Sequence, residues 1–255
     1  MTRYRGYLID LDGTLYKGER VVPSGLGFVE SLEERGLSYL YFTNNSLRRP
    51  EQVAEKLRGF GYPAKPEQVV TSAQATAAFL TETLGSPSVY AIGGEGLKAA
   101  LSEAGCRLTD QSPQAVVMGL DPAFTYDKMK TACLAIRAGA DFYGTNGDLM
   151  LPTDEGLLPG SGSLCAGVAA ATGVQPRFIG KPERPIVEYG MRRLGTTPEE
   201  TLIVGDNMMT DIRAGVDNGI DTLLVFGGVT SPEEYRNGTV RATYTVGDLK
   251  EWEFI

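Results

Sequence analysis

Short apolar runs alternate with amphipathic segments along most of the chain, and this pattern constrains the fold more than any other feature. Residues 4–10, 37–43 and 201–206 are short runs of mainly apolar residues, as buried strands are. The intervening segments, such as 24–36 and 183–195, repeat apolar residues at helical spacing and end at Gly. The alternation predicts an α/β fold, a Rossmann-like doubly wound parallel sheet with helices on both faces.

The same criteria predict further elements, and Ser24 is the expected N-cap of the first helix. Further strands are expected over residues 88–93, 114–120, 141–145, 177–180 and 222–227. Further helices are expected over residues 50–61, 72–85, 126–139, 162–173 and 208–219.

Charge and composition exclude several classes of function. The chain has 24 Lys and Arg against 32 Asp and Glu, a net charge of −8, which disfavours nucleic acid and anionic membranes as partners. It contains no His, so a Ser-His-Asp triad and His-ligated metals are excluded. The three Cys have no C-x-x-C spacing, and the first residues lack the apolar core of a signal peptide. We therefore expect a protein of the cytoplasm.

Polar residues follow several expected strands, where ligands bind in parallel α/β sheets. Asp10 and Asp12 follow the first strand, and Thr43 ends the second. Asp206 lies at the end of a later strand, with Asp211 one turn into the next helix. Two carboxylate pairs at one edge of a sheet favour a Mg²⁺ site, although each motif alone is also compatible with helix capping.

Lys181 also follows an expected strand and precedes Pro182. A single lysine is usually a solvated surface charge, but at the end of a strand this one is expected to face the same edge of the sheet. Taken together, the strand ends carry the groups required for phosphoryl transfer through an aspartate, without any His.

These residues lie in four motifs that resemble those of the haloacid dehalogenase-like phosphohydrolase superfamily. The motifs are DLDGT (Asp10–Thr14), FTNNS (Phe42–Ser46), GKP (Gly180–Pro182) and GDNMMTDI (Gly205–Ile212). Together with the stretch Thr145–Leu164, they resemble the NagD-like, or 4-nitrophenyl phosphatase, branch.

The resemblance implies a role for each residue. Asp10 would be the nucleophile and Asp12 the general acid and base, with Thr43 and Lys181 completing the catalytic set. The metal residues would be Asp10, Asp12 (through its backbone carbonyl), Asp206 and Asp211, the last either as a ligand or by orienting a ligand water or pairing with Lys181. The substrate would be bound by Thr43, Asn44, Asn45, Lys181, Thr145, Asn146 and Asp148.

Motif spacing predicts where a second domain is inserted. Only 30 residues separate Asp12 from Thr43, whereas Lys181 lies 138 residues beyond Thr43, far more than the core needs. We expect a catalytic core over residues 1–80 and 178–255, and an inserted α/β cap of the second type over residues 81–177. Dimers through this cap are common in the branch, so the resemblance is also compatible with a homodimer.

The expected function is a Mg²⁺-dependent phosphomonoester hydrolase (EC 3.1.3 class) that forms an aspartyl-phosphate. Its substrate would be a small phosphorylated metabolite, such as 4-nitrophenyl phosphate-type compounds, a sugar phosphate, glycerol phosphate, phosphoglycolate or a nucleoside monophosphate. Two alternatives remain open: a phosphotransferase or mutase that uses the same aspartate, and a non-catalytic module that binds a phosphorylated ligand.

Overall fold

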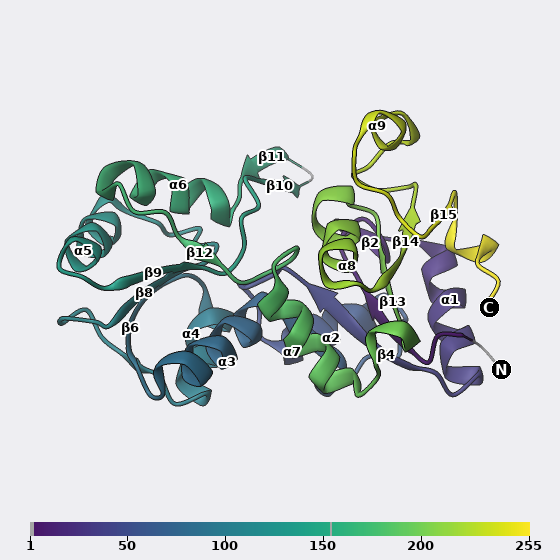
Figure 1. The fold of residues 1–255 in the computed structure, drawn as a ribbon, viewed down its shortest axis with the longest axis horizontal. Coiled ribbons are helices and arrows are strands. Elements are labelled where there is room, and N and C mark those ends of the chain that lie inside the picture. The colour runs from purple at the N-terminus through teal and green to yellow at the C-terminus, as the bar shows by residue number, and fades with distance from the viewer. Residues whose placement is uncertain (1–2, 154) are drawn as a thin grey trace. The chain divides into compact units, whose positions relative to one another are not determined.

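Two parallel sheets, each flanked by helices, organise the chain into two compact units. A computed structural model describes residues 3–153 and 155–255 of the protein. The first unit contains the chain up to Thr43 and residues 51–70 and 181–255, and the second contains residues 44–50 and 71–180. Figure 1 labels the elements of both units.

The first unit is built on a six-stranded sheet with the strand order β15-β14-β13-β1-β4-β5. Its strands are β1 (Gly6–Ile9), β4 (Ser38–Thr43), β5 (Val69–Thr71), β13 (Thr201–Gly205), β14 (Asp221–Val225) and β15 (Tyr244–Val246). A short antiparallel hairpin of β2 (Tyr16–Lys17) and β3 (Arg20–Val21) follows β1. The pairs from β15 to β4 are all parallel, as the apolar strand runs predicted.

Helices cover both faces of this sheet. Successive strand residues point to opposite sides, so apolar strands present side chains on both faces that helices bury. Tyr7 and Ile9 of β1 pack into the core that includes residues of α1 and α2. Leu8, between them, faces Gly190 of α7 on the other side. The helices of the unit are α1 (Pro23–Glu34), α2 (Pro50–Gly59), α7 (Arg184–Leu194), α8 (Arg213–Asn218) and α9 (Pro232–Asn237). Single helical turns are η1 (Pro66–Gln68), η2 (Pro198–Glu200), η3 (Met208–Ile212, a π-helical turn) and η4 (Leu249–Glu251).

The second unit contains a five-stranded parallel sheet with the order β12-β9-β8-β6-β7. Its strands are β6 (Ser88–Ile92), β7 (Arg107–Leu108), β8 (Ala115–Met118), β9 (Asp141–Gly144) and β12 (Arg177–Phe178). Its helices are α3 (Ser72–Leu84), α4 (Glu95–Glu103), α5 (Tyr126–Arg137) and α6 (Ser161–Thr172). In Figure 1, α5 and α6 lie on one side of this sheet and α3 and α4 on the other. An antiparallel hairpin of β10 (Met150–Thr153) and β11 (Gly156–Pro159) precedes α6.

The expected α/β class is confirmed, and two details differ from expectation. The first helix begins at Pro23 with Val22 as its N-cap and without a side-chain cap bond, so the prediction of Ser24 as N-cap is wrong. Proline is favoured in the first turn because it has no N–H to leave unpaired. The expected boundary after residue 80 falls inside α3, which groups with the second unit. The assignment of the two units as core and cap stays a prediction.

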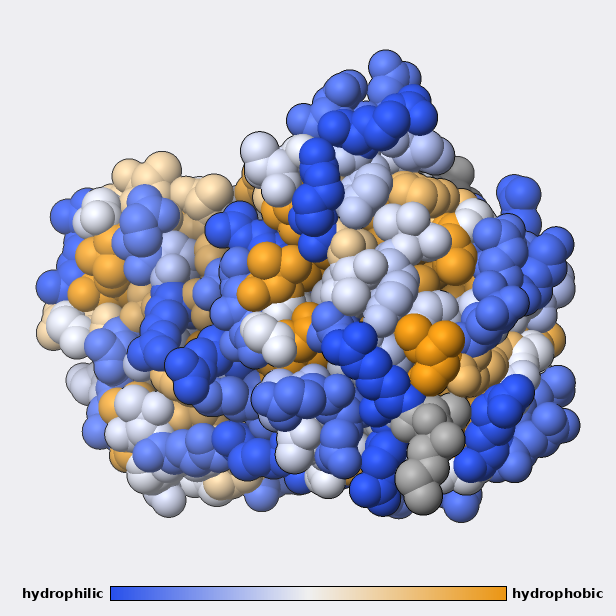
Figure 2. All heavy atoms as spheres, turned by 45° about the vertical axis from the view of Figure 1, so that its right-hand side comes forward, coloured by the Kyte–Doolittle hydropathy of each residue, from blue (hydrophilic) through white to orange (hydrophobic). Residues whose placement is uncertain are grey.

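Among the described residues, the face drawn in Figure 2 has no extended apolar patch. On the face drawn in Figure 2, hydrophilic side chains predominate and apolar ones form separate groups, as is normal for protein surfaces. Within residues 3–153 and 155–255, no helix is long and apolar enough to cross a membrane.

The packing of α1 generates a stability prediction. Val29 of α1 is fully buried, whereas Val216 of α8 is 50% exposed. Both lie in helices, so Val→Ala changes intrinsic helix propensity equally, and only Val29→Ala leaves a cavity in the core. We expect Val29→Ala to lower the free energy of unfolding by about 2 kcal/mol relative to Val216→Ala. Urea unfolding followed by the fluorescence of Trp252, which lies in the same core, measures this difference. Equal midpoints for the two variants would contradict the packing.

Candidate active site

The site lies where the topology of the first sheet reverses. In chain order, the strands run outward from β1 to β4 and β5 on one side, and from β13 to β14 and β15 on the other. Adjacent parallel strands whose connections leave in opposite directions open a crevice at their carboxyl ends. Asp10 follows β1 and Asp206 follows β13, so these two carboxylates lie at the reversal itself.

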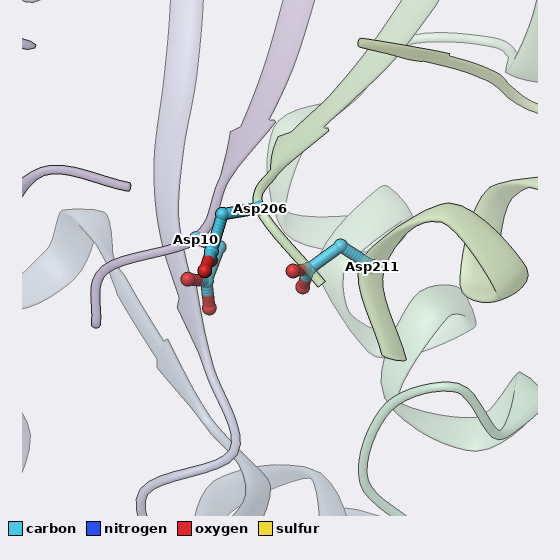
Figure 3. A group of neighbouring side chains, drawn as sticks. All are labelled: Asp10, Asp206 and Asp211. Atoms are coloured by element: carbon cyan, nitrogen blue, oxygen red, sulfur yellow. The ribbon is translucent and has the colours of Figure 1, made fainter. Parts of the chain in front are cut away.

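Three carboxylates converge at this point. Asp10, Asp206 and Asp211 each offer an oxygen, and these three atoms lie within 4.8 Å of one another. Figure 3 shows the side chains pointing toward one another from the ends of β1 and β13 and from η3. Asp10 is 8% exposed, and Asp206 and Asp211 are 1% exposed. The expected convergence of residues some 200 positions apart is therefore observed.

Lys181 is the cation at the centre of this group. Its Nζ lies 2.6 Å from Asp10 Oδ1 and 2.6 Å from Asp211 Oδ1, and donates to the Phe42 carbonyl at 3.0 Å. The side chain is buried, so the ammonium is held by protein oxygens. Thr43, the last residue of β4, is buried directly after Phe42. The structure thus brings Lys181 and Thr43 to the edge of the sheet where the carboxylates meet.

The Thr14 hydroxyl lies between two of the carboxylates. Thr14 Oγ1 is 3.1 Å from Asp206 Oδ1 and 3.3 Å from Asp10 Oδ2, and the side chain is buried. A hydroxyl has one hydrogen to donate, so it serves one carboxylate at a time. The sequence predicted no separate role for Thr14, although it is the last residue of the DLDGT motif.

A tight loop after β14 holds Asp206. The backbone N–H of Val229 donates to Asp206 Oδ2 at 2.6 Å, and that of Thr230 donates to the Asp206 carbonyl at 3.1 Å. A Cβ at Gly228 would lie 1.8 Å from Asp206 Oδ2, and one at Gly13, which has a φ of +96°, would lie 2.2 Å away. This loop was missed as part of the site because its only sequence signal was a pair of glycines after a strand.

Asp12 differs from the buried carboxylates. Its side chain is exposed, and its Oδ2 accepts a hydrogen bond from the Tyr16 hydroxyl at 3.1 Å. The backbones of Asp12 and Tyr16 also form an isolated parallel bridge. Asp12 is therefore at the mouth of the site rather than inside the carboxylate group.

Burial and mutual repulsion raise the pKa values of the three buried aspartates. Burial is the main cause for each, and the charge of Asp211 adds to it at Asp206 and that of Asp10 at Asp211. Lys181 opposes the shift at Asp10 and Asp211. Burial alone would lower the pKa of Lys181, but Asp10 and Asp211 outweigh it, so its pKa lies above the usual value.

The charge balance of this group fits a divalent cation. When all three carboxylates are ionised, they and the single ammonium carry a net charge of −2 in a buried site, which costs free energy unless a cation neutralises it. Clustered carboxylate oxygens are the donors that hard cations such as Mg²⁺ prefer. Asp10 and Asp206 would supply such oxygens, while one oxygen of Asp211 already pairs with Lys181.

The expected substrate residues outside the first unit form their own network in the second. Asn44 Nδ2 donates to Asp148 Oδ2 at 3.0 Å, and Asn146 Nδ2 donates to the Asn44 carbonyl at 2.8 Å. Asn45 Oδ1 accepts from two backbone N–H groups of its own turn, and Thr145 Oγ1 donates to Ser46 Oγ at 3.1 Å. The structure brings these residues together, and their role in binding a substrate stays a prediction.

Comparison with known proteins identifies the family. Residues 7–107 match the family model described as haloacid dehalogenase-like hydrolase, and residues 178–252 match a second, described as HAD-hydrolase-like. The 5'-nucleotidase YutF of Bacillus subtilis (strain 168) is 49% identical over 99% of this chain and 98% of its own. The chain belongs to the haloacid dehalogenase-like hydrolases.

Two further relatives of this hydrolase are phosphatases by name. The acid sugar phosphatase of Staphylococcus aureus (strain USA300) is 46% identical over 98% of this chain and 97% of its own. A crystal structure of a double mutant thermostable NPPase from Geobacillus stearothermophilus superposes with a TM-score of 0.95 at 45% identity, covering 100% of both chains. The expected enzyme class, a phosphomonoester hydrolase, and the expected branch are confirmed.

The glycine contact with Asp206 yields a matched pair of variants. A Cβ at Gly228 would overlap Asp206 Oδ2, whereas one at Gly227 would have nothing within 4 Å. Gly228→Ala must displace Asp206 or its loop, and a displacement of about 1 Å at an active site can cost about 100-fold in rate. We expect Gly228→Ala to hydrolyse 4-nitrophenyl phosphate about 100-fold more slowly than the parent, and Gly227→Ala to be within about twofold. Equal rates for both variants would mean that the Asp206 position does not control activity.

Proposed function

We propose that this chain hydrolyses phosphomonoesters of small metabolites through an aspartyl-phosphate on Asp10, with the help of a bound divalent cation. The observation that carries the proposal is the convergence of Asp10, Asp206, Asp211 and Lys181 at the reversal point of the sheet. This arrangement holds an ionised carboxylate beside a buried ammonium, at the position where ligands of such sheets bind.

In the first step, a carboxylate oxygen of Asp10 attacks phosphorus in line with the leaving oxygen. The bond between phosphorus and the leaving oxygen breaks, and Asp12 gives its proton to that oxygen, which departs as an alcohol. Asp12 is suited to this role because it lies two residues from Asp10 and is exposed at the mouth of the site.

In the second step, water releases the phosphate. Asp12, now ionised, takes a proton from the water while the water oxygen attacks phosphorus. The bond between phosphorus and Asp10 breaks, which regenerates the Asp10 carboxylate and yields inorganic phosphate. Lys181 stabilises the charge on the phosphoryl oxygens in both steps, and it contacts Asp10 directly.

The residues that would hold the cation are Asp10, Asp206 and the backbone carbonyl of Asp12, and we propose Mg²⁺ as the ion. When bound, the cation offsets the negative charge of carboxylates and phosphate and so allows their approach. The ion pair between Asp211 and Lys181 favours a positioning role for Asp211, since its Oδ1 is 2.6 Å from the ammonium. Asp211 Oδ2 accepts the Asn207 N–H at 3.1 Å, which further fixes its orientation.

The substrate class follows from the site and from the relatives. Thr43, Asn44 and Lys181 would bind the phosphoryl group, and Asn45, Thr145, Asn146 and Asp148 would contact the rest of the substrate. Relatives named as a 5'-nucleotidase, an acid sugar phosphatase and nitrophenylphosphatases support nucleoside monophosphates, sugar phosphates and aryl phosphates as candidates, beside glycerol phosphate and phosphoglycolate. A phosphate-release screen over these compounds with Mg²⁺ tests the proposal.

Asp10→Asn tests the nucleophile. The amide has no negative oxygen to attack phosphorus, so we expect turnover of 4-nitrophenyl phosphate to fall by about 10⁴-fold or more. Asp217→Asn, on an exposed position of α8, is the control and should stay within about twofold. Acid quenching during turnover and mass spectrometry should detect phosphate on the Asp10 peptide of the parent. A variant with near-parent activity would exclude Asp10 as the nucleophile.

Removal of the cation tests the metal site. We expect EDTA to abolish phosphate release and excess Mg²⁺ to restore it, because the carboxylates and the phosphate would otherwise repel each other. Binding also stabilises the folded state, so Mg²⁺ at about 100 times its dissociation constant should raise the free energy of unfolding by about 2.7 kcal/mol. Asp206→Asn should lose most of this stabilisation. Activity that is indifferent to the chelator would contradict the site.

A further inference from the structure

Tyr16 links the mouth of the site to a helix of the first unit. It is the first residue of β2, in the short hairpin that follows the DLDGT motif. Its hydroxyl donates to Asp12 Oδ2 at 3.1 Å, and its backbone carbonyl accepts from Gly13 N at 2.7 Å. The residue is only 5% exposed, whereas the carboxylate that it contacts is exposed. The buried side chain of Tyr16 therefore holds one carboxylate oxygen of the exposed Asp12.

The Tyr16 ring is itself held on two sides. The Phe60 ring packs against it with centroids 5.2 Å apart, and Lys56 Nζ of α2 lies 4.4 Å from its centroid. Lys56 also donates to the Gly18 carbonyl at 3.1 Å and lies 3.4 Å from Glu19 Oε1, both in the turn between β2 and β3. The ring cannot change rotamer without breaking these contacts, so the position of its hydroxyl oxygen is fixed by packing.

We infer that Tyr16 is a positioning residue for Asp12, holding its carboxyl group in the orientation required for proton transfer to the leaving group. The inference rests on the proposed role of Asp12 as acid and base. The hydrogen bond to Oδ2 holds the carboxyl group of Asp12 in one orientation at the mouth of the site. In the first step the Asp12 proton passes to the leaving oxygen as its bond to phosphorus breaks, and Tyr16 keeps its own proton.

The inference predicts a dependence on the leaving group. An alkoxide is a poor leaving group and requires the proton, whereas 4-nitrophenolate leaves without one. Tyr16→Phe keeps the ring, with its Phe60 and Lys56 contacts, and deletes only the hydroxyl. Losing one hydrogen bond corresponds to about tenfold in rate. We expect the first step to slow about tenfold for glycerol phosphate and to change less than about twofold for 4-nitrophenyl phosphate.

The measurement is single-turnover cleavage with excess enzyme and Mg²⁺, which isolates the first step from phosphate release. The control is Tyr62→Phe, whose hydroxyl donates to the Leu15 carbonyl at 2.7 Å and so supports the same hairpin without touching Asp12. A general loosening of the hairpin would slow the cleavage of both substrates by the same factor. We expect Tyr62→Phe either to slow both equally or to slow neither, and Tyr16→Phe to slow glycerol phosphate cleavage selectively. Thermal unfolding of Tyr16→Phe should stay within about 4 °C of the parent.

A double-mutant cycle with Asp12→Asn completes the test. If Tyr16 acts through Asp12, adding Tyr16→Phe to Asp12→Asn slows glycerol phosphate cleavage no further. Equal slowing of both substrates by Tyr16→Phe, no slowing of either, or a full tenfold effect in the Asp12→Asn background would each overturn the inference. A parent that cleaves neither ester would instead refute the proposed function, so the two failures are distinguishable.

Discussion

Three buried carboxylates, two of them paired with the Lys181 ammonium, are the interaction on which the site depends. Like charges in a medium of low polarity repel strongly, and burial alone would favour the neutral acids. The fold keeps them together by giving each a donor: Lys181 for Asp10 and Asp211, the Val229 N–H for Asp206, and the Asn207 N–H for Asp211. Each carboxylate therefore has at least one donor that the fold itself supplies. Donors that are already aligned cost no reorganisation during a reaction, which is the condition for electrostatic catalysis.

The sheet explains why these groups meet. β1 and β13 are neighbours although they lie almost 200 residues apart, and their register pairs Ile9 with Val204. The residues that follow these strands are thereby placed side by side at the carboxyl edge. The exposed carboxylate of Asp12 is held differently. It accepts a hydrogen bond from the hydroxyl of Tyr16, whose ring packs against α2 and Phe60. The site thus combines an inner group fixed by backbone pairing with an outer group fixed by side-chain packing.

Much of this was predictable from local pattern. The strands expected at 4–10, 37–43 and 201–206 are mainly apolar because helices cover both faces, and the observed β1, β4 and β13 fall inside these ranges. Carboxylates that follow such strands are then predicted to meet at the carboxyl edge of the sheet. Elements with weaker signals were missed, including α4 and the hairpins β2-β3 and β10-β11, whose strands are two to four residues long. The roles of Thr14, Gly228 and Tyr16 depend on contacts across the fold, which spacing along the chain does not encode.

The first unit is discontinuous in sequence, and this has a consequence for its synthesis. Chain growth from the N-terminus supplies β1, β4 and β5 early, but the neighbour of β1 on its other side, β13, begins only at Thr201. The whole second sheet, from β6 to β12, is translated in the interval. During synthesis on the ribosome, all strands of the second unit are therefore available before β13 can complete the sheet of the first unit. Until β13 is synthesised, one edge of β1 has no pairing strand. That edge requires protection from pairing with other chains.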